Sequence, residues 1–217
     1  MTFILIQLFN FLLHFDKYLG TFITEYGILV YFILFFIIFM ETGFVLTPFL
    51  PGDTLIFVAG VFAANNLLNV FVLFFILSLA SIMGDTLNYW IGKIFGEKAF
   101  SRFIKQEHMD RTKKFYEEHG TKTIILARFV PIVRTFAPFV AGIGKMKYTK
   151  FLKYNIIGGL AWVTIFLFGG YFFGTVPFVE ENLTLIMIII IIASLIPTFY
   201  QLIKEKRKNK SKNLNSL

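Results

Sequence analysis

The sequence predicts an all-α polytopic membrane protein with spanning helices and two opposed re-entrant hairpins, each made of a broken helix. Hydrophobic residues make up 57% and charged residues 16% of the chain, against about 45–50% and about 25% in soluble domains. Residues 54–84, 154–179 and 182–203 contain no charged side chain. Since about 20 apolar residues in a helix cross about 30 Å of hydrocarbon, all three stretches are long enough to span a membrane.

The chain begins with an apolar stretch, and residues 1–26 are predicted to form a helix that either lies at the interface or spans. Polar side chains interrupt it at 3–23, which favours the interface. The first hairpin is predicted at 28–64, with its break at TPFLPGD, residues 47–53, because proline removes a backbone donor and glycine ends helices. The second arm, 54–64, covers only about 16 Å as a helix. An arm too short to cross indicates a re-entrant segment.

A spanning helix is predicted at 67–94, followed by a polar, basic surface helix at 97–120. The apolar stretch at 121–144 is broken by Pro131 and Pro138, with Lys122 before it and Lys145 after it. Positively charged flanks stay on the cytoplasmic side. This stretch is therefore predicted to enter and leave on one side, as a second hairpin opposed to the first.

The rest of the chain carries two more predicted spans. Residues 154–174 cross outward to an acidic loop, and a C-terminal spanning helix within 176–203 returns. The lysine-rich tail at 204–217 and the segment 98–122 are predicted to be cytoplasmic, with 65–69 and 176–182 on the far side. The net charge of +8 then reflects membrane topology and not nucleic-acid binding.

Four charged residues fall inside apolar stretches, namely Glu41, Asp53, Arg128 and Arg134, and Asp85 near a helix end is a fifth candidate. One charge at the bilayer centre costs about 2.5–3.5 kcal/mol, so these residues are expected to pair across the hairpins or to line a water-filled cavity. A purely structural ion-pair network is the alternative. Because apolar replacement of a buried pair is often no less stable, a functional role is favoured.

Glycines with helical spacing have a simpler interpretation. Gly84 and Gly92 lie eight residues apart, and Gly170 and Gly174 form a GxxxG motif. Small residues on one helical face let neighbouring helices approach closely. Both patterns therefore predict helix packing.

Asn155, Gly159 and Trp162 share one helical face, which predicts a polar contact, close packing and an interfacial ring. The chain has no cysteine, its three histidines lack metal-ligand spacing, and no glycine-rich phosphate loop is present. We therefore expect no metal, no cofactor and no enzymatic activity.

Taken in order along the chain, these motifs resemble the DedA family of membrane proteins, also called SNARE-associated or VTT-domain proteins. The resemblance covers residues 27–175. It is carried by Glu41 with PFLPGD at 48–53, by GDTLNYWIG at 84–92 and by RFVPIVRT at 128–135. The residues that follow in the family's order are Gly142, Met146, Phe151, Asn155, Gly159 and Trp162.

The resemblance implies transport of a phosphate-bearing lipid between leaflets of the bacterial cytoplasmic membrane. Undecaprenyl phosphate and phosphatidylethanolamine are the candidate lipids. The resemblance also implies substrate binding by Arg128 and Arg134 and proton coupling through Glu41 and Asp53. An arginine fork can hold a phosphate with two hydrogen bonds and stays charged, while the acids would compete for the arginines.

Secondary candidates for the site are Asp85, Tyr89 and Asn155. The expected partners are membrane lipids and protons, and a homo-oligomer stays open. Two other functions fit the same charges. One is a small-ion or solute transporter, and the other is a structural membrane assembly factor.

Overall fold

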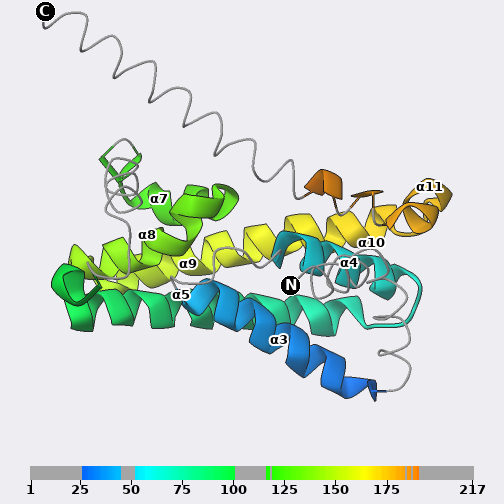
Figure 1. Ribbon diagram of the computed structural model, residues 1–217, viewed down its shortest axis with the longest axis horizontal. Helices are drawn as coiled ribbons and strands as arrows, with labels where there is room; N and C mark the ends of the chain where they lie inside the picture. The colour runs from blue at the N-terminus through cyan, green and yellow to red at the C-terminus, as the bar shows by residue number, and fades with distance from the viewer. Residues whose placement is uncertain are drawn as a thin grey trace, which may run out of the picture.

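Two long helices lie side by side and form the base of the fold (Figure 1). The computed structural model describes residues 26–44, 52–100, 116–117, 119–183, 185–186 and 188–190. The first long helix is α5, Val70–Phe100. The second runs through α9, Tyr148–Val163, a π-helical segment η3, Thr164–Phe168, and α10, Gly169–Phe173. The predicted elements at 3–23 and 204–217, and most of 97–120 and 183–203, lie outside the described residues.

Both long helices have the length and composition of membrane spans. Val70–Phe95 and Tyr148–Phe173 are apolar stretches of 26 residues each, or about 39 Å as α-helix. Only 39% and 33% of their most apolar windows are buried inside the structure, whereas a core helix of a soluble protein is mostly buried. Phe71, Phe75 and Leu79 line one exposed face of α5 at 66%, 70% and 53% exposure. The described chain is helical, and its exposed apolar faces fit a membrane protein.

The first broken helix consists of α3, Ile28–Gly43, and α4, Gly52–Ala64. Helix α3 starts beside the beginning of α5, because the Tyr31 hydroxyl accepts a hydrogen bond from the N–H of Asn69 at 2.7 Å. Helix α4 returns to the same end, since only residues 65–69 join it to α5. Asn69 caps α5 by accepting from the N–H groups of Phe71 and Val72. Helices α3 and α4 therefore each have one end close to residues 65–69. This end of the molecule is called the asparagine end below.

The second broken helix comprises η1, Gly120–Lys122, α7, Thr123–Leu126, and η2, Ala127–Phe129, followed by α8, Pro131–Ile143. The break falls at Val130, whose backbone is extended (φ −126°, ψ 100°), and Pro131 opens α8. The prediction of a second break at Pro138 is wrong, because Pro138 lies inside α8. Residues 133–142 are all buried, and this packing outweighs the roughly 3 kcal/mol that an interior proline costs.

Glycines mark the closest helix crossings, which confirms their predicted packing role. A side chain at Gly84 would overlap Thr42 and the Phe39 carbonyl of α3. A side chain at Gly92 would overlap the carbonyl of Phe139 in α8. Near the asparagine end, Gly170 would overlap the Phe57 carbonyl of α4 in the same way. The two broken helices are thus pressed against the long helices at glycine positions.

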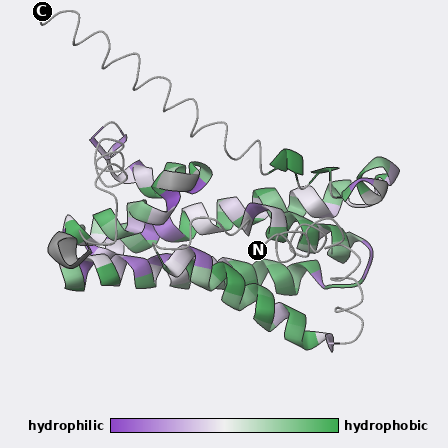
Figure 2. Ribbon diagram, in the orientation of Figure 1, coloured by the Kyte–Doolittle hydropathy of each residue, from purple (hydrophilic) through white to green (hydrophobic). Residues whose placement is uncertain are grey.

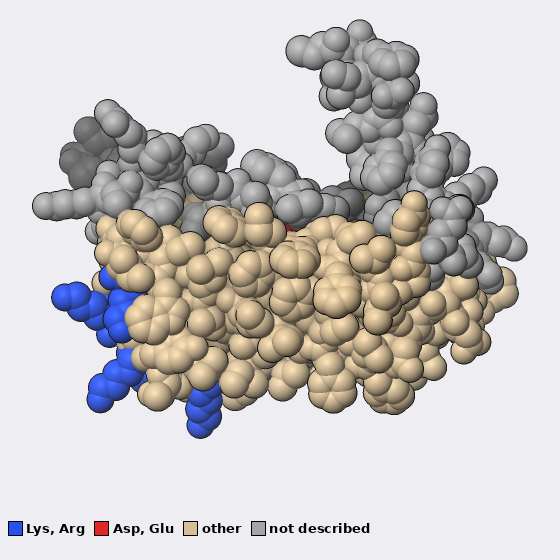
Figure 3. All heavy atoms as spheres, turned by 90° about the horizontal axis from the view of Figure 1, so that it is seen from below, with Lys and Arg blue, Asp and Glu red and all other residues tan. Residues whose placement is uncertain are grey.

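The end opposite the asparagine end is basic. Figure 3 shows Lys and Arg side chains gathered toward one end of a face on which little other charge is visible. Within the part of the chain that the structure describes, six exposed lysines lie at this end, called the basic end below, namely Lys93, Lys122, Lys145, Lys147, Lys150 and Lys153. The segment 176–182, predicted as a loop, contains a short helix instead, α11, Pro177–Glu181. Pro177 at its first position is pre-organised for a helix, which the acidic composition of the segment did not reveal.

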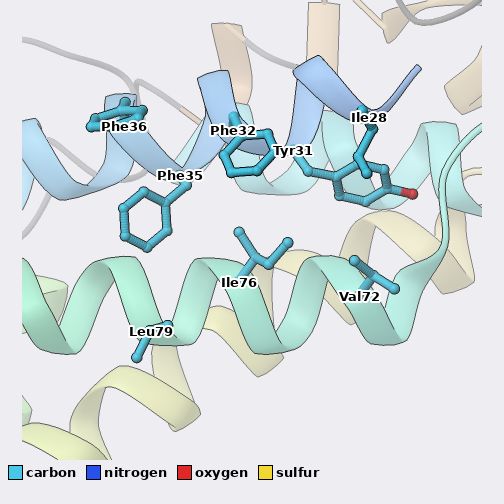
Figure 4. A pocket seen from close by; sticks show the side chains of 8 residues that line it. All are labelled: Ile28, Tyr31, Phe32, Phe35, Phe36, Val72, Ile76 and Leu79. Atoms are coloured by element: carbon cyan, nitrogen blue, oxygen red, sulfur yellow. The ribbon is translucent and has the colours of Figure 1, made fainter.

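An apolar groove of about 560 Å³ runs between α3 and α5 (Figure 4). Its walls are aromatic on α3 and aliphatic on α5, as Phe32, Phe35, Phe36, Val72, Ile76 and Leu79 show. Figure 2 shows the same hydrophobic character along α3. Such a surface suits hydrocarbon and offers a polar solute no partner.

Candidate functional site

Three helix ends meet where the two broken helices face each other. Nη1 of Arg134 donates to Oδ1 of Asp53 at 2.8 Å, and Nη2 of Arg134 donates to Oε1 of Glu41 at 3.1 Å. Asp53 lies in the first turn of α4 and Arg134 in the first turn of α8, whereas Glu41 lies in the last turn of α3. Helix dipoles favour acids at N-termini and bases at C-termini. Glu41 and Arg134 thus lie at the unfavourable ends of their helices, and this placement does not serve helix stability.

Arg128 forms a second, separate set of contacts with the long helices. It is paired with Asp85, and it donates to Oγ of Ser81 and Oδ1 of Asn155, each at 2.6 Å. Asn155 is fixed in turn, because its Nδ2 donates to the Ile82 carbonyl at 3.0 Å. The expectation that Glu41 and Asp53 compete for both arginines therefore differs from the pairing observed, in which Arg128 has Asp85 as its acid.

Trp162 connects the two sets. Its Nε1–H donates to Oδ1 of Asp53 at 2.8 Å. Its ring centre lies 4.1 Å from Cζ of Arg134 and 5.9 Å from Cζ of Arg128. The prediction of an interfacial ring is wrong, since Trp162 is fully buried. The sequence signal for this burial was the position of Trp162, seven residues after Asn155 on the same helical face.

The five charged residues, Glu41, Asp53, Asp85, Arg128 and Arg134, form one buried charge cluster. The exposed fraction is 3–8% for all of them except Asp53, whose side chain is 16% exposed. Three carboxylates against two guanidinium groups leave one excess negative charge when all are ionised. Among the described residues, Oε2 of Glu41 is buried without a hydrogen-bond partner. With every group ionised, the cluster is therefore neither electrically neutral nor fully hydrogen-bonded.

Two further polar residues of α5 make contacts outside the charge cluster. Tyr89 is buried, but its hydroxyl donates to the Met146 carbonyl and its ring stacks on Phe151, away from the charges. Asn88 was not predicted, and its Nδ2 donates to the carbonyls of Thr42 and Thr135. Ser81, Asp85 and Asn88 recur at helical spacing in an apolar helix, which is the sequence signal that could have identified a polar face.

The described residues offer acids and guanidinium groups but no metal centre. No group of three or more His, Cys, Asp or Glu is placed to hold a metal ion in this part of the chain. The geometry permits one set of hydrogen-bond acceptors on an arginine to be replaced by another. Both terminal nitrogens of Arg134 are occupied by carboxylate oxygens, and another doubly accepting anion could replace them.

Comparison with known proteins gives similarities that cover more than half of the chain. A family model described as the VTT domain matches residues 50–172. The chain is 53% identical to Protein DedA of Escherichia coli (strain K12) over 206 residues, which cover 92% of this chain and 94% of that protein. It is 42% identical to an uncharacterized membrane protein of Mycobacterium leprae (strain TN) over 165 residues, 74% of each chain. Inner membrane protein YghB of Salmonella typhimurium is 31% identical over 191 residues, 83% of this chain and 87% of that protein. No solved structure matches the chain at a significant level.

Proposed function

The chain belongs to the DedA family of VTT-domain membrane proteins, and from this premise and the charge cluster we propose that it moves a phosphate-bearing lipid between leaflets, coupled to protons. The observation that carries the proposal is the arrangement around Arg134. Its two terminal nitrogens each donate to a different carboxylate. A phosphate accepts from the same two nitrogens through two of its oxygens. The carboxylates thus occupy the positions that a lipid phosphate would take.

The charge count supports proton coupling. With all five groups ionised, the cluster carries one excess negative charge, and a bound phosphate adds at least one more. Accumulating like charges in a site removed from water is costly, so an incoming anion requires that carboxylates become neutral. In the proposed cycle, protonation of Glu41 or Asp53 releases Arg134, and the lipid phosphate binds it. Proton release then restores the carboxylate pairs and expels the phosphate.

The arrangement of the helices supports access from both sides. We place both broken helices within the bilayer as re-entrant hairpins, α3 and α4 from the asparagine end and α7 and α8 from the basic end. Asp85 lies midway along α5, Val70–Phe100, so the cluster falls near the middle of a span of that length. Opposed broken helices that meet at mid-membrane are typical of transporters. The hydrocarbon tail of the lipid would stay in the surrounding bilayer.

The proposed orientation puts the basic end in the cytoplasm, because lysines near membrane spans are retained there. Single cysteines at Lys150 and Leu67 test this directly, since the chain contains no cysteine and both side chains are exposed. A membrane-impermeant maleimide added to intact cells is expected to label the L67C variant and not the K150C variant. The reverse pattern would invert the assignment.

The proposed function is tested by reconstitution into vesicles. Purified protein is expected to expose undecaprenyl phosphate or phosphatidylethanolamine on the opposite leaflet, while diacylglycerol, which has no phosphate, moves at the rate of protein-free vesicles. Ion or solute flux without lipid movement would favour the solute transporter. An assembly factor would produce neither. If every phosphate-bearing lipid moves as slowly as in protein-free vesicles, lipid transport by this chain is excluded.

A further inference from the structure

We propose that Trp162 is a positioning residue of the charge cluster. It keeps the guanidinium group of Arg134 oriented while Glu41 and Asp53 release it, and it holds Asp53 in place as the carboxylate with which Arg134 pairs again. This inference rests on the proposed function. Trp162 is fully buried, on the same long helix as Asn155, and it touches both an acid and a base of the cluster. Neither contact is explained by packing alone.

The first part of the role concerns the indole face. Arg134 extends from the first turn of α8, and its two partners come from the ends of α3 and α4. When both carboxylates are neutral, those hydrogen bonds no longer hold the guanidinium group. The ring of Trp162 lies 4.1 Å from Cζ of Arg134 and does not depend on protonation. A desolvated cation–π contact therefore keeps the fork oriented for a phosphate.

The second part concerns the indole N–H. Oδ1 of Asp53 accepts from both Nη1 of Arg134 and Nε1 of Trp162, each at 2.8 Å. A donor that can only donate favours the ionised carboxylate. Glu41 has no side-chain donor of this kind besides Arg134, because its Oε1 accepts from Arg134 and its Oε2 lies beside the backbone of Gly52. The groups that face Glu41 are Arg134 and Asp53, with Asp85 and Arg128 farther along the cluster. Trp162 thus makes the two acids unequal, because its indole N–H donates to Asp53.

Two substitutions separate these roles, and Trp90 provides the matched control. Trp162→Phe keeps an aromatic face over Arg134 but loses the N–H, so Oδ1 of Asp53 keeps only one of its two donors. The transport rate is then expected to reach half its maximum at a higher pH, with little change in apparent affinity for undecaprenyl phosphate. Trp162→Leu loses the face as well, and the apparent affinity should fall by about tenfold. Trp90→Phe alters the only other tryptophan, at the basic end beside Lys93, and should leave both properties unchanged.

Fluorescence supplies a readout that does not require transport. In the Trp90→Phe variant Trp162 is the sole tryptophan, and its emission is expected to change with pH as the carboxylates titrate. Adding Asp53→Asn should remove most of that change. Either of two results would overturn the proposal. One is a Trp162→Phe protein with the wild-type pH profile of transport, and the other is a pH-dependent change in Trp162 emission that is the same with and without Asp53→Asn. If wild-type protein moves no phosphate-bearing lipid, the proposed function fails, and the fluorescence result alone decides whether Trp162 positions Asp53.

Discussion

Replacing Arg134 with lysine is expected to lower the rate of lipid movement by about ten- to a hundredfold while leaving the amount of folded protein near normal. Arg134 uses two nitrogens of one plane to reach Asp53 and Glu41. Lysine keeps the charge but has one compact ammonium group without that fork. A hydrogen bond to a charged partner contributes about 1.5–3 kcal/mol, and each 1.4 kcal/mol is a factor of ten. Losing one of the two bonds to a phosphate gives the expected range.

The measurement is the vesicle assay together with size-exclusion chromatography of the purified variants. Lys153→Arg is the matched control, since Lys153 is exposed at the basic end and its charge is retained. Arg128→Lys should also reduce the rate, because Arg128 contacts Asp85, Ser81 and Asn155 at once. Wild-type activity in both lysine variants would remove the case for phosphate binding by a planar fork.

The second large effect is expected for the pair of Arg128 and Asp85. Arg128→Ala removes the arginine partner of Asp85, which is buried, and removal of one partner of a buried pair costs about 3–5 kcal/mol of stability. The double variant Arg128→Met with Asp85→Leu removes both charges and keeps much of the volume. It is expected to regain most of that stability, measured as the thermal unfolding temperature of the purified protein in detergent.

The same double variant separates a structural from a functional role. The proposed function predicts that it folds but moves lipid at no more than about a tenth of the wild-type rate, because the loss of even one charged hydrogen bond has that effect. Wild-type lipid movement by a stable double variant would show that this pair only holds the helices together.

Much of the fold follows from local features of the sequence. The uncharged stretches place the two long helices, because only an apolar helix of that length crosses a bilayer. Pro131 places the break before α8, because proline favours the first helical position. The charges could be expected to gather because an isolated buried charge is costly.

The pairing inside the site could not be predicted in the same way. Arg128 lies 43 positions from Asp85 along the chain, so their contact depends on the rotation of each helix about its axis and on glycine crossings. Trp162 has an amphipathic side chain that suits an interface as well as a buried hydrogen bond. Amino-acid composition therefore does not indicate which of these two environments Trp162 occupies. The tolerance of Pro138 likewise depends on the packing around α8 and not on the proline itself.

The central claim is that protonation of a carboxylate releases Arg134 for a lipid phosphate, and Glu41→Gln tests it most directly. Glutamine has the shape of the neutral acid but cannot exchange a proton. In vesicles with an imposed proton gradient, wild-type protein is expected to accelerate the movement of undecaprenyl phosphate. The Glu41→Gln variant should still bind this lipid but lose the response to the gradient and most of its turnover. Wild-type movement that is independent of the gradient at every pH, or an unchanged response in the glutamine variant, would contradict the account.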